Sequence, residues 1–322
     1  ARQVLEYAIA VAPVRQVMLA ADFLMFNTSR LKPSIIEPEQ LVPNGNAGIR
    51  IHATRLGGNL LSLNAIFSSI ETIKRIEALC PADQPFIAIT GRWGFERIEM
   101  CGGITSPSKF AWVFGPLLRS DGFGDATYHQ FSFVNAEKGF DSWIEYAKIL
   151  RIAHENGIDL RIVIPPIHAW QLELIHAIGL WDDFEFWKAE MARLNEDQAR
   201  QEAPFPIWDF AVYNEYTTEA VRTDRPGSIA MRWFVDNSHM TPEFGDLVLS
   251  EVLSEREPAI PNNQDGLGIL LTTNMIEEHL GSIRQERRRY LDTTDLESLQ
   301  NVMELNGVTY EPAMPTHLTA ND

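Results

Sequence analysis

The sequence predicts an α/β fold in which a parallel sheet, buried on both faces, is built from strands that alternate with amphipathic helices. Three short apolar runs, at 17–21, 162–164 and 207–210, are each followed by loop-like residues. Uninterrupted apolar runs of this length are typical of parallel strands that helices cover on both sides. Because longer helical patterns separate them, we expect a doubly wound sheet.

Helices are expected where apolar residues recur every three or four positions. The chain begins in such a pattern, over 2–11, and the same spacing occurs in four later segments. Apolar residues at this spacing share one face of a helix, so these segments are expected to pack against the core. They are marked by Leu63, Ile66, Phe67 and Ile70; by Trp143, Tyr146, Ala147 and Leu150; by Phe244, Leu247, Val248 and Val252; and by Ile276, Leu280 and Ile283.

We expect a single domain over residues 1–292, with an insertion at 81–137 and a polar C-terminal tail over 293–322. The insertion is rich in glycine and aromatic residues, and its 57 residues are too many for a bare loop in a compact domain. We expect it to pack against the sheet or to cover a cleft. Its aromatic residues are interpreted as a small core cluster in preference to a ligand platform. The tail is weakly periodic and is expected to be loosely held.

Composition narrows the classes of partner. At 45% hydrophobic and 22% charged residues, the chain lies in the globular range, which argues against disorder and coiled coil. Its 27 basic and 44 acidic residues give a net charge of −17, which disfavours nucleic acid and anionic lipid as ligands. The densest basic run holds Arg284, Arg287, Arg288 and Arg289, and we interpret it as the solvated end of a helix.

The remaining sequence signals bear on cofactors and on location. Cys80 and Cys101 are too few for a disulfide framework, and no spacing of Cys and His is typical of zinc. No cofactor is therefore expected. No window of about 18 uninterrupted apolar residues occurs, so a transmembrane helix is not predicted. The sequence starts at Ala1, already inside a helical pattern, so we expect the natural start to lie upstream, where a signal peptide or membrane anchor is possible.

The segment with the clearest chemical pattern is 233–246, which reads WFVDNSHMTPEFGD. Its Asp236 precedes His239 by three residues, in a loop just ahead of a helix. A carboxylate so placed can accept a hydrogen bond from one imidazole nitrogen, which leaves the other nitrogen to act as a base. Alternatively, Asp236 is only a turn former, while Thr241 and Pro242 are the N-cap and first turn of the following helix.

Several blocks, in their order along the chain, resemble the SGNH, or GDSL-like, hydrolase superfamily. The closer similarity is to a bacterial group of SGNH-like proteins related to polysaccharide O-acetyltransferases. The blocks are Val17 to Asn27 (VMLAADFLMFN), Leu61 to Ser69, Ile164 to Trp170 (IPPIHAW), Ile207 to Asn214 (IWDFAVYN) and the segment around Asp236 and His239.

The resemblance implies a three-layer α/β/α flavodoxin-like domain with a Ser-His-Asp site. Asp236 is then the residue that orients the imidazole, and His239 is the general base. The implied activity is that of an esterase or O-acyltransferase acting on an acylated cell-envelope carbohydrate, in the bacterial envelope or periplasm. A non-catalytic SGNH-like protein that binds glycan or a protein partner is the alternative.

Two departures from the superfamily pattern affect this expectation. The GDS-like block that supplies the nucleophilic serine does not occur in the sequence. We expect that block and the first strands to lie upstream, so the strand at 17–21 is expected to form an exposed sheet edge. Where the superfamily has an Asn that donates to the oxyanion, this chain has Asp22, and an ionised Asp only accepts hydrogen bonds. Asp22 is then protonated, turned away or a cap of local backbone, and Asn27 is a weaker candidate donor.

Two other residues are possible neighbours of the site. His168 follows an expected strand, where it either begins the next helix or faces the site. Asp209 lies inside an apolar run, so it needs a partner if it is buried. A metal site built from Asp236, His239 and His168 is not supported by any compact ligand motif, and no metal is expected.

Overall fold

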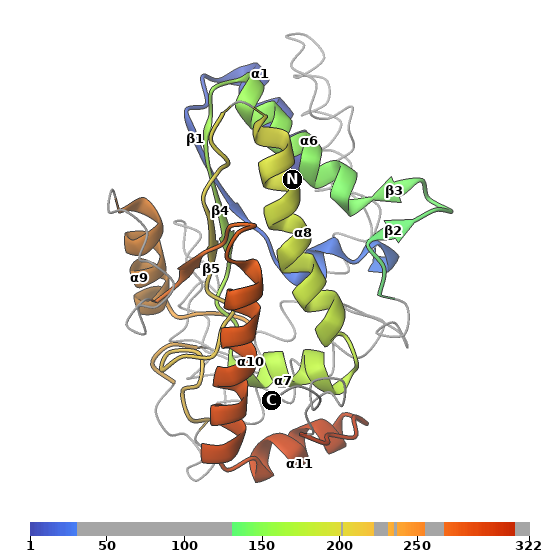
Figure 1. Cartoon of the computed structure of the whole chain (residues 1–322), viewed down its shortest axis with the longest axis vertical. Helices are drawn as coiled ribbons and strands as arrows, with labels where there is room; N and C mark the ends of the chain where they lie inside the picture. The colour runs from blue at the N-terminus through green and yellow to red at the C-terminus, as the bar shows by residue number, and fades with distance from the viewer. Residues whose placement is uncertain (31–130, 201, 222–230, 235–236, 255–266, 313–322) are drawn as a thin grey trace, which may run out of the picture. The chain divides into compact units, whose positions relative to one another are not determined.

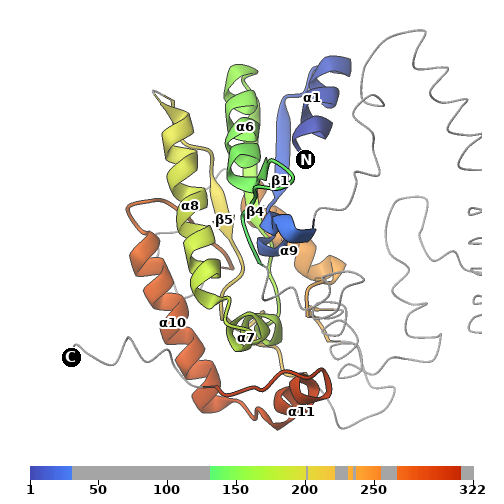
Figure 2. The same ribbon diagram turned by 90° about the vertical axis from the view of Figure 1, so that its right-hand side faces the viewer.

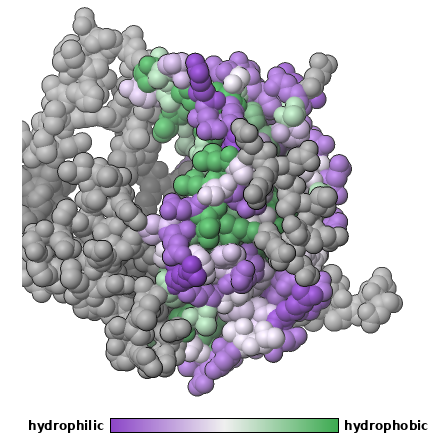
Figure 3. Space-filling view, turned by 90° about the vertical axis from the view of Figure 1, so that its left-hand side faces the viewer, coloured by the Kyte–Doolittle hydropathy of each residue, from purple (hydrophilic) through white to green (hydrophobic). Residues whose placement is uncertain are grey.

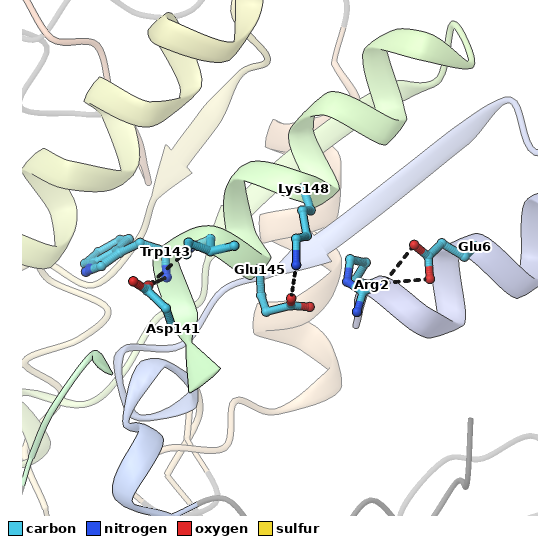
Figure 4. A network of polar contacts seen from close by, with 7 residues as sticks. Arg2, Glu6, Asp141, Trp143, Glu145 and Lys148 are labelled. Atoms are coloured by element: carbon cyan, nitrogen blue, oxygen red, sulfur yellow. Dashed lines mark hydrogen bonds and ion pairs between the residues drawn. The ribbon is translucent and has the colours of Figure 1, made fainter. Parts of the chain in front are cut away.

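The computed structural model describes residues 1–30, 131–200, 202–221, 231–234, 237–254 and 267–312. The chain divides into two units, one formed by Ala1–Pro13, Pro33–Thr105 and Asp224–Ser228 and the other by Val14–Lys32, Ser106–Thr223 and Ile229–Asp322. The described part of the first unit contains α1 (Arg2–Val11), the helix expected there. Arg2 and Glu6, one turn apart on α1, form an ion pair (Figure 4).

The second unit contains a mixed sheet in which parallel pairing dominates (Figure 1). Its strands lie in the order β1 (Gln16–Ala20), β4 (Asp159–Ile164), β5 (Ile207–Asp209) and β6 (Ile269–Leu270). The first three are parallel, as the apolar runs predict, with Leu19 opposite Ile162 and Ile162 opposite Ile207. β6 is antiparallel to β5 and was not expected, because a two-residue strand leaves no readable pattern.

The strands differ in how deeply they are buried. The last three residues of β4 and all of β5 are buried, in agreement with strands covered on both faces. β1 instead alternates between exposed and half-buried residues, and Met18 is 39% exposed. This is consistent with its place as an edge strand of the described sheet, where β4 is its neighbour.

Helices cover both faces of this sheet, which confirms the α/β class. Figures 1 and 2 show α6 (Ser142–Glu155), α8 (Trp181–Ala199) and α10 (Ile276–Thr293) on one face and α9 (Pro242–Leu253) on the other. α7 (Ala169–Ala177) follows the carboxyl end of β4. No helix within the described ranges has the length and apolar character that crossing a membrane requires.

Helix starts follow from the local sequence. Asp141 caps α6 by accepting hydrogen bonds from the amides of Trp143 and Ile144, and a Glu145–Lys148 pair lies along the first turns (Figure 4). Of the four marker residues expected for this helix, Tyr146 and Leu150 are buried, and Trp143 and Ala147 are half-buried.

α9 begins as the sequence indicates. The Thr241 hydroxyl caps it by accepting from the Phe244 amide, and Pro242 occupies its first turn. Phe244, Val248 and Val252 are buried at four-residue spacing, against the sheet. Three other apolar residues of α9, Leu247, Leu249 and Leu253, are 38–46% exposed, and apolar side chains gather on that side of the molecule (Figure 3).

An aromatic cluster fills the space beside β1. Phe23, in the short helix η1 (Phe23–Phe26), stacks on Phe131 at 4.5 Å and packs edge-on against Phe184 of α8. Phe133 joins the cluster through Trp143. Phe131 and Phe133 are the described aromatic residues of the expected insertion, and both are half-buried in this cluster, in agreement with the small aromatic cluster expected; 81–130, and the helix expected at 63–70, lie outside the described residues. A two-stranded ribbon, β2 (Val134–Asn135) with β3 (Phe140–Asp141), and η2 (Thr28–Arg30) complete this region.

The segment after residue 293 differs from the loose polar tail expected. Glu297–Leu305 form α11, which buries Leu299, Val302 and Met303, and Tyr310 is buried beyond it. The apolar residues are few, but their spacing of three and four places them on one helical face. Up to residue 312 the tail is therefore packed, while 313–322 lie outside the described residues.

Candidate functional site

The candidate site lies at the carboxyl ends of the parallel strands, where ligands bind in open α/β sheets. The segment 231–241, here called the His239 loop, is described except for residues 235 and 236. It meets the first turn of α7, since the His168 amide donates to the Asn237 carbonyl at 3.0 Å. The connection after β5 reaches the same turn, because the Ala169 amide donates to the Thr217 carbonyl at 2.8 Å.

The base of the His239 loop is closed by backbone contacts. Phe234 and Met240 form an antiparallel bridge, and the Thr241 amide donates to the Trp233 carbonyl at 2.8 Å. The Thr241 hydroxyl donates to the Arg232 carbonyl, also at 2.8 Å. The two described ends of the loop thus lie side by side and lead directly into α9, and His239 is next to the bridge residue Met240.

The side chain of Glu219, in the connection after β5, binds this closed end of the His239 loop. The carboxylate of Glu219 accepts from the amides of Arg232 and Trp233 at 2.6 and 2.9 Å. Asn237 holds the other side of the loop, because its buried side chain donates to Gln171 Oε1 of α7 at 2.5 Å. Within the described residues, Asn237 Oδ1 has no hydrogen-bond partner.

His239 itself is exposed, and its Nδ1 lies 3.2 Å from the Ser238 hydroxyl. Asp236, the residue expected to orient the imidazole, lies outside the described residues. The Asp236–His239 pair therefore stays a prediction: a carboxylate oxygen about 2.6–3.2 Å from an imidazole nitrogen. What the structure adds is that the imidazole reaches solvent at the carboxyl edge of the sheet.

His168 begins α7, as one reading of the sequence has it, and it does so at the edge where the His239 loop docks. Its Nδ1 accepts from the Trp170 amide at 3.1 Å, so its Nε2 carries the hydrogen and donates to the Glu219 carbonyl at 2.8 Å. Burial lowers the pKa of His168 to about 4, although the bond to Glu219 opposes this shift. The ring is neutral at pH 7.

The side-chain oxygens of Asp22 and Asn27 accept hydrogen bonds from backbone amides in and near η1. Asp22 Oδ1 accepts from the Leu24 amide at 2.7 Å, which is the local capping role that the sequence allows. Asn27 Oδ1 accepts from the Ser29 amide and hydroxyl and from the Ser132 amide. These contacts tie η1 to the strand region after 131.

Asp209 is fully buried and finds the partners that its position requires. Its Oδ2 accepts from Lys188 Nζ of α8 at 2.6 Å and from His279 Nε2 of α10 at 2.7 Å, while its Oδ1 accepts from the Ala211 amide. Burial raises the pKa of a carboxyl, but the Lys188 charge and the hydrogen bonds outweigh it and hold the pKa of Asp209 below its ordinary value. Asp209 thus joins the sheet to two helices.

Sequence reasoning missed a second buried network. Glu173 of α7 accepts two hydrogen bonds from Arg287, at 2.8 and 2.7 Å, and one each from the hydroxyls of Tyr213 and Tyr310. Burial and the nearby Glu173 charge raise the pKa of Tyr310, so its hydroxyl keeps the proton that it donates. A signal was present: Glu173 lies in an otherwise apolar stretch, where a carboxylate requires a cation.

The same network corrects the interpretation of the basic run as a solvated helix end. α10 continues to Thr293, so the run lies in its middle, and Arg287 is only 2% exposed. Arg284 pairs with Glu185 of α8, while Arg288 and Arg289 are exposed. Half of the run therefore connects α10 to its neighbours.

The structure thus brings His168 and the His239 loop to one edge of the sheet, while Asp209 faces helices α8 and α10. Among the residues described, no group of three or more His, Cys, Asp or Glu is placed to hold a metal ion. Comparison with known proteins adds no relationship: no family model matches the chain, and no curated protein or solved structure matches it either.

Proposed function

We propose that this protein is an SGNH-like esterase or O-acyltransferase in which His239 is the general base and Asp236 orients it. The substrate class is an acylated carbohydrate of the cell envelope, and the sheet is the core of a flavodoxin-like domain. The observation that carries the proposal is an exposed imidazole held at the carboxyl edge of a parallel sheet, three residues after an aspartate.

In this proposal the two imidazole nitrogens of His239 have different tasks. Nδ1 faces the Ser238 hydroxyl, so this is the side on which polar groups orient the ring. Nε2 then takes the proton of the attacking hydroxyl, and the resulting alkoxide adds to the acyl carbonyl. When the tetrahedral intermediate collapses, the ester C–O bond breaks and the leaving hydroxyl group takes the proton back from Nε2. Ser238 belongs to the orienting side and is not proposed as the nucleophile, a role that falls to another serine.

The test, on the protein expressed from its natural start, is the hydrolysis of acetyl esters, first p-nitrophenyl acetate and then acetylated oligosaccharides. We expect His239→Ala to lower kcat by about 100-fold or more, since general base catalysis contributes on that scale. His154→Ala is the matched control: His154 ends α6 just ahead of β4, at the opposite end of the sheet, where it pairs with Glu202. Equal activity of the two variants would exclude His239 as the base.

One observation favours a second candidate, a non-catalytic protein that binds glycan. The side chain at the end of β1 is Asp22, a carboxylate that accepts the Leu24 amide, where an oxyanion hole needs a donor. Under this alternative even the protein expressed from its natural start hydrolyses no acetyl ester, and calorimetric titration with acetylated oligosaccharides shows binding that His239→Ala weakens.

A further inference from the structure

We propose that His168 is a positioning residue that fixes the His239 loop, and with it the imidazole of His239, at the carboxyl end of β4. The inference rests on the proposed function for the meaning of His239 but not for the contacts themselves. His168 contacts the loop at Phe234 and at Asn237. It is also linked to the closed end of the loop through one further residue, Glu219.

His168 is linked to the closed end of the loop through the main-chain carbonyl and the side-chain carboxylate of Glu219. Its main-chain carbonyl accepts the hydrogen of His168 Nε2 at 2.8 Å. Its carboxylate accepts the amides of Arg232 and Trp233, the residues whose carbonyls bind Thr241. Glu219 therefore fixes the loop through its carboxylate, and His168 in turn binds the main chain of Glu219.

His168 also contacts the loop directly at two residues. The His168 ring meets the Phe234 ring edge-on, with centroids 5.3 Å apart. The His168 amide donates to the Asn237 carbonyl. His239 lies two residues beyond Asn237. A shift of His168 is therefore expected to move the backbone of Asn237 and, with it, the imidazole of His239.

A purely structural role has to be separated from this one, because His168 also caps α7 through Nδ1. Two substitutions divide the functions of the ring. His168→Asn places an amide oxygen near the position of Nδ1, which keeps the cap but loses the donor to Glu219. His168→Gln places an amide N–H near the position of Nε2, which keeps that donor.

The experiment is residue-resolved amide hydrogen exchange on the full chain and its variants. In His168→Asn we expect the Thr241 amide to exchange at least about tenfold faster than in the wild type, since the hydrogen bond from the His168 ring to the Glu219 carbonyl is lost. The Phe210 amide, which donates to the Ile164 carbonyl in the sheet, should be unchanged. His168→Gln should restore most of the protection of Thr241.

His176→Asn is the matched control, since His176 lies in the last turn of the same helix. It should leave the exchange of Thr241 unchanged. The positioning role is wrong if His168→Asn leaves Thr241 protected, or if it accelerates Thr241 and Phe210 equally, because equal acceleration indicates global unfolding.

Ester hydrolysis by the same variants separates this inference from the proposed function. In an active enzyme, His168→Asn should lower kcat at least about tenfold with KM within about twofold, and His168→Gln should recover most of the loss. If the protein expressed from its natural start hydrolyses no ester, the proposed function is wrong, whereas the exchange pattern alone decides whether His168 positions the loop.

Discussion

The buried charge networks and the His239 loop lie in the same unit, but they differ in the burial and the hydrogen bonding of their ionisable groups. Asp209 and Glu173 are fully buried, and each carboxylate accepts three or four hydrogen bonds, most of them from other elements. His239 is exposed, and it lies in a loop that contacts α7 and the connection after β5. Buried ionisable groups with several partners contribute to architecture, while an exposed imidazole on an anchored loop can be reached by a ligand.

The largest effect is expected at Asp209. Asp209→Ala should lower the free energy of unfolding by about 3–5 kcal/mol, because it leaves the buried Lys188 without its counter-charge. Urea denaturation measures the loss. Asp197→Ala, also a partner of a basic residue on α8 but 54% exposed, should cost less than about 1 kcal/mol. Similar losses in the two variants would remove the contrast between buried and exposed charge.

A smaller effect is expected from the titration of His168. The unfolded chain binds a proton at the ordinary pKa near 6.5, whereas the folded protein binds it only near 4. Because the unfolded state holds more protons in this window, the stability falls as the pH falls from about 6.5 to 4, by about 3 kcal/mol in all.

Comparison with His168→Asn isolates this contribution from other groups, among them His176, whose pKa burial also lowers. Urea denaturation from pH 7 to 4 should show a shallower decline for the variant, with the difference appearing below pH 6.5. Parallel plots of the free energy of unfolding against pH would show that His168 is not the buried neutral imidazole described.

Tyr310→Phe tests whether the buried network extends to the C-terminal segment. We expect the free energy of unfolding to fall by about 1–2 kcal/mol, since one hydrogen bond to the Glu173 carboxylate is lost. Leu305→Ala, at an 81% exposed position of α11, should change it by less than about 0.5 kcal/mol. Equal, small effects would mean that the segment adds nothing to the stability of the fold.

The smallest change in stability is expected at His239. His239→Ala should alter the free energy of unfolding by less than about 0.5 kcal/mol, because an exposed side chain in a loop contributes little. Thermal unfolding followed by circular dichroism checks this value. A loss above 1 kcal/mol would place His239 with the structural networks and weaken its assignment as a base.

The parts of the fold that periodicity predicts are those whose burial repeats along one segment. β1, β4 and β5 were expected from short uninterrupted apolar runs, and helices α6, α9 and α10 from apolar residues that recur every three or four positions. β6 and α11 were missed because two residues, or three apolar positions among polar neighbours, are too short a pattern.

The site was harder to predict because its contacts join distant segments. His239 and His168 stand out locally, by motif and by position after a strand. Their connection does not, since it depends on Glu219, whose backbone and side chain bind different segments 51 and 13–14 residues away. The Glu173–Arg287 pair spans 114 residues, so the basic run looked like a helix end.

The register of β1 has a consequence for the order in which the sheet forms. Gln16 pairs with Asp159, 143 residues later, whereas Ile162 and Ile207 of β4 and β5 are only 45 residues apart. Closing the longer loop costs about 1 kcal/mol more in chain entropy. On the ribosome, β1 emerges well before its partner, so we expect β4, α7, α8 and β5 to fold first and β1 to join a sheet already assembled.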